Sequence, residues 1–186
     1  MPLRCGARGS FGVGGTGAGI GIGEGGGIYT PGGTVTVNNS TVVENQSRDA
    51  GGGMRVQGSL NLVSTIVGLN NTRVNFNDTS AAPDVSATGT VINTSNLLNR
   101  AVNSNTLVTP FLAGGENVVY QPLATAENGT AAHVLVTGSP ALNVGANPNG
   151  LATDQVGNPR TQNGTTDVGA IEGTSPIPVP PPGSPG

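Results

Sequence analysis

Two glycine triplets mark the start of a repeated unit in this sequence. They begin at positions 25 and 51, so the repeat is 26 residues long. After the first triplet, apolar and polar residues alternate in Thr34-Val35-Thr36-Val37, which is typical of a strand with one buried face. Repeats of roughly 20 to 50 residues indicate solenoids, because one unit cannot bury its own apolar face. The pattern therefore predicts units that stack on copies of themselves.

The alternation also predicts which side chains face the interior of the stack. β-Branched residues suit these positions because their side chains are already restricted and pack well on a pleated surface. The side chains expected inside, as aliphatic ladders, are Val35, Val37, Val42, Val43, Leu60, Leu62, Ile66 and Val67. Asn45 and Asn70 are expected to form a hydrogen-bonded ladder at a corner. No helical period is present, which argues against alternating strands and helices.

Composition narrows the possible functions. All seven basic residues are arginine, and ten acidic residues give a formal net charge of −3. This balance offers no basic surface for a phosphate backbone, so nucleic acid is not expected as a partner. The 34% of hydrophobic residues fall into alternating patterns, which disordered chains lack. Cys5 is the one cysteine, so no internal disulfide framework and no cysteine-based metal cluster can form.

The chain divides into four parts by composition. Residues 1–24 form a glycine-rich lead-in or partial coil, residues 25–130 the predicted β-helix coils, and residues 131–173 a capping segment. Residues 174–186 are rich in proline and are expected to be an extended, disordered tether. No stretch has the length and apolar character of a membrane span or a secretory leader. We expect the chain to be a fragment of a longer exported protein.

Glycine-rich and amide-rich stretches raise two possible ligands. Gly12, Gly14 and Gly17 satisfy the G-x-G-x-x-G pattern of dinucleotide sites, but neither the strand nor the helix that such a site needs can be recognised around them. The region 75–78 contains Asn75, Asn77 and Asp78, which could bind Ca²⁺ weakly, since few carboxylates converge there. We therefore predict no cofactor, and we leave calcium open.

Catalytic groups are also sparse. Enzymes that cleave pectin share the β-helix fold, but this chain has no lysine and its acids are scattered, with Asp78 and Asp84 the nearest to a pair. His133, Ser139 and Asp154 could in principle form a nucleophilic triad, yet no nucleophile-elbow pattern surrounds Ser139. We predict no catalytic site and no metal site.

The repeats and the last part of the chain resemble a known family. The Gly25-to-Tyr29 coil start resembles the repeats of bacterial right-handed parallel β-helix surface proteins, including polymorphic outer-membrane-protein-like repeats. Residues 132–143, 153–160 and 167–172 resemble the closing motifs of the choice-of-anchor Q domain, with departures at Asn143 and Val156. The resemblance implies an exported protein in which this module closes a β-helix before a variable surface anchor. It implies no reaction.

The charged residues of the closing motifs suggest a structural role. An open β-helix end exposes unpaired strand edges and needs a cap. An arginine paired with carboxylates could hold the last loop over the core. The cap candidates are Asp154, Arg160, Asp167 and Glu172, and the outward-facing candidates for ligand contact are Thr34, Thr36, Arg55 and Asn61.

Together these features predict an all-β chain, a right-handed parallel β-helix solenoid with an irregular C-terminal cap. The expected function is non-catalytic, extracellular or cell-surface display or adhesion, with glycans or host and cell-surface components as partners. A fragment of a polysaccharide lyase or glycoside hydrolase of the β-helix type is the alternative. An ice-binding solenoid is a third possibility, but Ser59-x-Asn61 interrupts the Thr-x-Thr row begun by Thr34 and Thr36.

Overall fold

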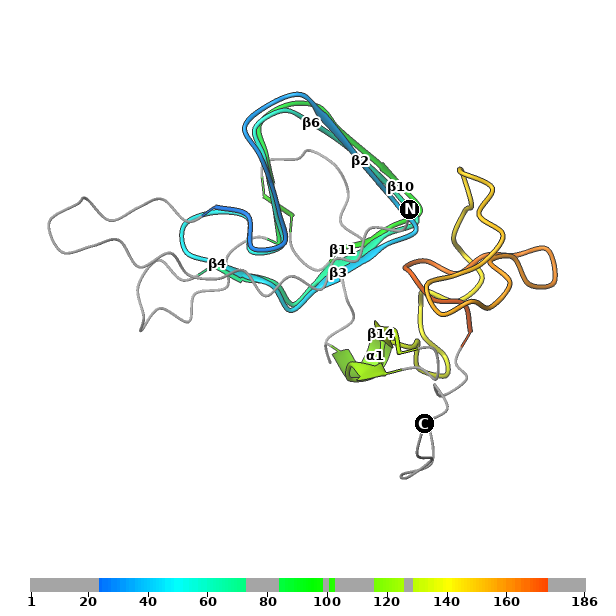
Figure 1. Ribbon diagram of the computed structural model, residues 1–186. Helices are drawn as coiled ribbons and strands as arrows, with labels where there is room; N and C mark the ends of the chain where they lie inside the picture. Colours follow the sequence, from blue (N-terminus) through cyan, green and yellow to red (C-terminus); the bar gives the residue numbers. More distant parts are fainter. Residues whose placement is uncertain (1–23, 73–83, 99–100, 103–115, 126–128, 174–186) are drawn as a thin grey trace, which may run out of the picture.

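The computed structural model describes residues 24–72, 84–98, 101–102, 116–125 and 129–173, and the regular structure in these residues is strand apart from one short helix. All but one of the sheets formed by the described strands are parallel and none closes into a barrel, so the all-β prediction is confirmed. Three successive passes of the chain lie on one another, and we call them rungs 1 to 3 (Figure 1). Rung 1 spans residues 24–47, rung 2 residues 50–72 and rung 3 residues 84–98.

Each rung contributes one strand to each of several sheets. Rung 1 holds β1 (Ile28–Thr30), β2 (Thr34–Asn38), β3 (Thr41–Val43) and β4 (Gln46–Ser47). Rung 2 holds β5 (Met54–Val56), β6 (Ser59–Val63), β7 (Ile66–Gly68) and β8 (Asn71–Thr72). Rung 3 holds β9 (Val85–Ala87), β10 (Val91–Thr94) and β11 (Leu97–Leu98), and β12 (Ala101–Val102) then pairs with β9. The sheet orders are β1-β5-β9-β12, β2-β6-β10, β3-β7-β11 and β4-β8.

The register of these sheets gives the repeat length directly. Ile28 pairs with Met54, 26 positions on, which matches the spacing of the glycine triplets. Val35 pairs with Leu60, 25 positions on, and Leu60 pairs with Val91, 31 positions on. The repeat is thus regular between rungs 1 and 2 and longer between rungs 2 and 3.

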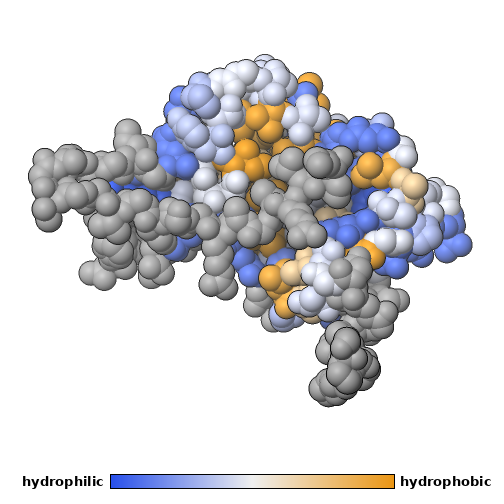
Figure 2. Space-filling model, viewed as in Figure 1, coloured by the Kyte–Doolittle hydropathy of each residue, from blue (hydrophilic) through white to orange (hydrophobic). Residues whose placement is uncertain are grey.

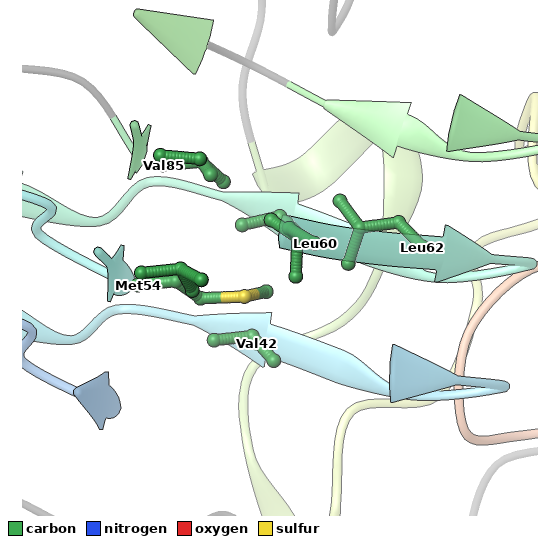
Figure 3. Packing of buried hydrophobic residues seen from close by; sticks show 8 residues of the cluster. Val42, Met54, Leu60, Leu62 and Val85 are labelled. Atoms are coloured by element: carbon green, nitrogen blue, oxygen red, sulfur yellow. The ribbon is translucent and has the colours of Figure 1, made fainter. Parts of the chain in front are cut away.

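Aliphatic side chains fill the space enclosed by the rungs. Figure 2 shows apolar residues gathered within the outline of the stacked strands and hydrophilic residues around them. Val42, Met54, Leu60, Leu62 and Val85 pack together there (Figure 3), and Leu60 and Leu62 are fully buried. The predicted interior positions in β2 and β6 are therefore confirmed.

Two of the predicted interior residues lie on the other face. Val43 and Ile66 contact a second apolar cluster, formed with Tyr120, Leu135 and Val168 from the end of the chain. In a strand, neighbouring side chains point to opposite faces, so Val42 and Val67 inside require Val43 and Ile66 outside. The prediction for Val43 and Ile66 was wrong because an apolar pair in a short strand does not indicate which member faces inward.

Asparagine side chains connect the rungs at one corner. Asn45 Nδ2 donates to Asn70 Oδ1 at 3.0 Å, and the Asn45 backbone N–H donates to the same oxygen at 2.9 Å. Asn70 Nδ2 in turn donates to Asp84 Oδ1 at 3.0 Å. The predicted asparagine ladder is confirmed, and it continues into rung 3 through a carboxylate.

Beyond rung 3 the described chain leaves the parallel arrangement. It forms α1 (Glu116–Val119), then β13 (Ala124–Thr125) and β14 (Ala131–Ala132), which pair antiparallel. Coils were predicted as far as residue 130, so this stretch differs from the prediction. No helix described here is long and apolar enough to cross a membrane. The predicted lead-in before residue 24 and the proline-rich tether lie outside the described residues.

The last described part, residues 131–173, is the closing segment. It consists mainly of turns and lies beside the stacked rungs, near the corner between β2 and β3 (Figure 1). Its apolar residues pack on the outer side of β3 and β7. The closing segment therefore covers a flank of the stack, whereas the sequence predicted a cap over its end.

Candidate functional site

The buried charges of the closing segment form one cluster around Arg160. The Arg160 side chain is only 1% exposed, and it is the largest of the fully buried side chains in the described residues. Its Nη2 donates to the carbonyl oxygens of Asp167 at 2.9 Å and Gly169 at 2.7 Å. Its Nε lies 3.3 Å from Glu172 Oε1, in an ion pair whose side chains are almost fully buried. Arg160 thus joins two separate turns of the closing segment.

The three carboxylates of the cluster bind backbone N–H groups. Asp154 Oδ1 accepts from Val156 and Asn158, and its Oδ2 accepts from Glu172. Glu172 accepts from the backbone N–H of Asp167 through both carboxylate oxygens. In the same way Asp167 Oδ1 accepts from Asn143 at 2.7 Å, and Asp167 Oδ2 accepts from Gly173 at 2.6 Å. The four cap candidates therefore lie together, and these contacts hold turns in place.

Burial shifts the ionisation of two members of this cluster. Removal from water lowers the pKa of Arg160, and the nearby carboxylates of Glu172, Asp154 and Asp167 oppose that shift. Burial raises the pKa of Glu172 to about 7, against the backbone hydrogen bond from Asp167 and the charge of Arg160. Glu172 therefore changes its charge near neutral pH.

We expect the contribution of Glu172 to the stability of the chain to fall as pH rises from about 4.5 to 7. The pKa of Glu172 is about 7 in the folded chain and 4.5 without burial, so between these values the folded state binds more protons. The free energy of unfolding is then highest below pH 4.5 for this group and decreases toward pH 7, by about 1.4 kcal/mol per unit of pKa difference. The measurement is the urea midpoint between pH 5 and 8. Glu172→Gln should flatten the slope, and an unchanged slope in that variant would contradict the assignment.

Polar side chains of the rung corners hold the closing segment to the stack. Asn39 Nδ2 donates to Ala146 O at 2.6 Å, and Ser64 Oγ accepts from Ala146 N at 2.8 Å. Thr41 Oγ1 accepts from Ala170 N at 3.0 Å. Asn39 and Ser64 occupy equivalent corners with positive φ angles of 46° and 53°. None of these three contacts could be predicted from the sequence, because they join residues more than 80 positions apart.

A hollow of about 720 Å³ lies between rung 1 and the closing segment. One side is formed by the β2–β3 corner and the inward-facing side chains of rung 1, and the other by residues 149–155. Arg160 and Asp154 also line it, so the buried charge cluster borders this space. This hollow could not be predicted from the sequence, because its two sides come from opposite ends of the described chain.

The predicted ligand-contact residues lie on two different sheets. Thr34 and Thr36 in β2 and Asn61 in β6 share the outer face of the β2-β6-β10 sheet, where Asn61 Nδ2 donates to Thr36 Oγ1 at 3.5 Å. Arg55 lies in β5, in the β1-β5-β9-β12 sheet. Its Nη1 donates to Ser86 Oγ at 2.7 Å, and its Nε lies 3.4 Å from Glu24 Oε1. The structure therefore brings together three of the four residues.

The catalytic alternatives gain no geometric support from the described residues. His133 Nδ1 lies 2.9 Å from Gln121 O, while Ser139 Oγ accepts from Ala141 N, so the proposed triad members bind other groups. Asp84 is buried in the stack, and Asp78, like the possible calcium ligands, lies outside the described residues. Among the described residues, no group of three His, Cys, Asp or Glu side chains is placed to hold a metal ion.

Comparison with known proteins gives no relative. No protein-family model, curated protein or solved structure matches this chain. The resemblance of its repeats and closing motifs to a family therefore stays a prediction. Two features carry the functional inference, namely the polar face of the β2-β6-β10 sheet and the surroundings of the closing segment.

Proposed function

We propose that this chain is part of a right-handed parallel β-helix that acts outside the cell or on its surface, without catalysis, in display or adhesion. Parallel pairing that repeats in the same order through three rungs supports the β-helix. The motifs that resemble the choice-of-anchor Q domain support surface attachment. Glycans are the proposed ligands, and the face of the β2-β6-β10 sheet is the proposed contact surface.

The observation that carries glycan contact is the composition of this face. Parallel register places Thr34 beside Ser59, and Thr36 beside Asn61. Hydroxyl and amide groups both donate and accept hydrogen bonds, which suits a ligand rich in hydroxyls. Ile92 follows Asn61 in the same row and is 52% exposed, so an apolar group is available for the C–H face of a sugar. Adjacent rows of this kind lie about 4.8 Å apart, as in any sheet.

We expect the double variant Thr34→Val, Asn61→Val to weaken glycan binding about tenfold or more. Valine keeps the preference for a strand, whereas the two polar contacts, each worth about 0.5–1.5 kcal/mol, are lost. The measurement is biolayer interferometry on immobilised pectins, alginates and other glycans. Thr125→Val, an exposed change in β13, is the matched control and should leave binding unchanged.

Two results would contradict the proposal. Wild-type chain with the circular dichroism of a β protein that binds no glycan would rule out the contact surface. Release of sugar from these polymers, with or without calcium and above a heat-treated control, would support the alternative of a carbohydrate-active enzyme instead.

A further inference from the structure

An exposed aromatic ring lies beside polar side chains on the outer face of the β1-β5-β9-β12 sheet. Tyr29 in β1 is 51% exposed. Parallel register places Tyr29 beside Arg55, and Arg55 beside Ser86. Neighbouring side chains of a strand point to opposite faces, and the preceding residues, Ile28 and Met54, pack into the core. Tyr29 and Arg55 therefore lie next to each other on the outer face, in adjacent strands about 4.8 Å apart.

Contacts with its neighbours fix the orientation of Arg55. Its Nη1 donates to Ser86 Oγ at 2.7 Å, and its Nε lies 3.4 Å from Glu24 Oε1. The other carboxylate oxygen, Glu24 Oε2, accepts from Gln57 Nε2 at 3.1 Å. The side chains of Arg55 and Glu24 are 16% and 18% exposed, so both are held by the protein and still reach solvent.

Both charged groups keep hydrogen-bonding capacity toward solvent. Arg55 Nη2 takes no part in the contacts above, and it is not one of the buried unpaired atoms of the described residues, so it can donate to an acceptor from solvent. Each oxygen of the Glu24 carboxylate has one contact and two lone pairs, so it can accept a further hydrogen bond. The cluster therefore offers a fixed donor and a fixed acceptor beside an aromatic ring.

Charge and surface character narrow the chemistry of the ligand. One carboxylate already balances the guanidinium, so the cluster has no net charge to attract an anion or a cation. Sugar hydroxyls both donate and accept, and the C–H groups of a sugar ring can lie on an aromatic face. The core of a protein–protein interface is apolar, whereas Tyr29 is surrounded by Glu24, Arg55 and Gln57. A neutral sugar fits these groups better than a protein partner.

We propose that Tyr29, Arg55 and Glu24 bind one neutral sugar unit of a glycan. The sugar ring lies on Tyr29, while hydroxyls on neighbouring carbons accept from Arg55 Nη2 and donate to the Glu24 carboxylate. This inference rests on the proposed function in that glycans are the ligands. It places a second contact on another sheet, and it shares no residue with the β2-β6-β10 face.

The test is saturation-transfer NMR titration with four neutral tetrasaccharides, made of glucose, mannose, galactose or N-acetylglucosamine, and with tetragalacturonate as the charged match to galactotetraose. We expect the wild-type chain to bind at least one neutral tetrasaccharide, and to bind tetragalacturonate more weakly than galactotetraose. Tyr29→Ala should weaken the neutral ligand about three- to tenfold, because the stacking surface is lost. Tyr29→Phe should retain binding, because it keeps the ring. Leu123→Ala, which also removes an exposed apolar side chain, is the matched control and should change nothing.

A second variant tests the balance of charge. Glu24→Gln removes the carboxylate and leaves Arg55 without its counterion. Binding of tetragalacturonate should then strengthen relative to that of galactotetraose. An unchanged ratio of the two affinities would contradict the role of the Glu24–Arg55 pair.

This inference and the proposed contact surface can fail separately. Thr34→Val, Asn61→Val should weaken polymer binding and leave tetrasaccharide binding at Tyr29 unchanged. If the wild-type chain binds no neutral tetrasaccharide, or if Tyr29→Ala and Leu123→Ala bind equally well, the inference is overturned, whatever the polymer assay shows. Loss of self-association in Tyr29→Ala, measured by analytical ultracentrifugation without any sugar binding, would assign the ring to a protein contact and overturn it as well.

Discussion

Replacing Arg160 with Met is expected to reduce the free energy of unfolding by about 3–5 kcal/mol. The change leaves the carboxylate of Glu172 buried without its cation, 3.3 Å from where Nε was. It also leaves the carbonyl oxygens of Asp167 and Gly169 without their donor. Methionine retains most of the apolar length of the side chain, so the loss reports on charge and hydrogen bonding more than on volume.

The measurement is urea unfolding followed by circular dichroism at pH 7.5. Arg48→Met is the matched control, because the Arg48–Asp49 pair is 3.8 Å apart and both side chains are about one-third exposed. Arg48→Met is expected to lower the free energy of unfolding by only about 0–1 kcal/mol. Limited proteolysis should cut the closing segment of Arg160→Met faster than that of the control.

A second substitution distinguishes the cost of the buried Glu172 charge from the other losses of stability in Arg160→Met. Adding Glu172→Gln to Arg160→Met removes the unpaired carboxylate, so part of the lost stability should return. If Arg160→Met and Arg48→Met destabilise the chain equally, the cluster does not hold the closing segment.

The stacked rungs could be predicted from the sequence because their determinants are local. Alternation placed Leu60 and Leu62 inside correctly, and the spacing of the triplets gave the pairing of Ile28 with Met54. Asn45 and Asn70 recur at the same point of two successive units, which is why their ladder could be foreseen. In each case, the residues that make a contact also occupy equivalent positions in the repeat.

The surroundings of the closing segment could not be predicted in the same way. Asn39 and Thr41 bind Ala146 and Ala170 across more than 100 positions, and no periodicity relates these segments. Ile66 faces outward and is covered by a distant segment, so its apolar character alone did not indicate its direction. The four charged residues of the cluster were identified because they belong to the closing motifs, whereas the place where the cluster packs against the rungs depends on tertiary structure alone.

Replacing Gly51 with Ala is expected to destabilise the chain by about 2–5 kcal/mol. Gly51 has a φ angle of +61°, which is unfavourable for a residue with a Cβ by about 1–2 kcal/mol. A Cβ at this position would also overlap the carbonyl oxygen of Met54, so the turn that leads into β5 must move. Such forced shifts add about 1–3 kcal/mol. The measurement is the urea midpoint together with the amide exchange of β5.

Gly33→Ala separates the two contributions to this loss. Gly33 has a φ angle of +80°, and a Cβ there would meet nothing within 4 Å. Its substitution should therefore carry the conformational penalty alone, about 1–2 kcal/mol, and leave the exchange of β5 unchanged. Equal losses of stability in Gly51→Ala and Gly33→Ala would mean that the triplets need glycine only because of its positive φ angle. A larger loss at Gly51 would mean that they are required because neighbouring backbone lies too close for any side chain, which explains why the triplet recurs with the rung.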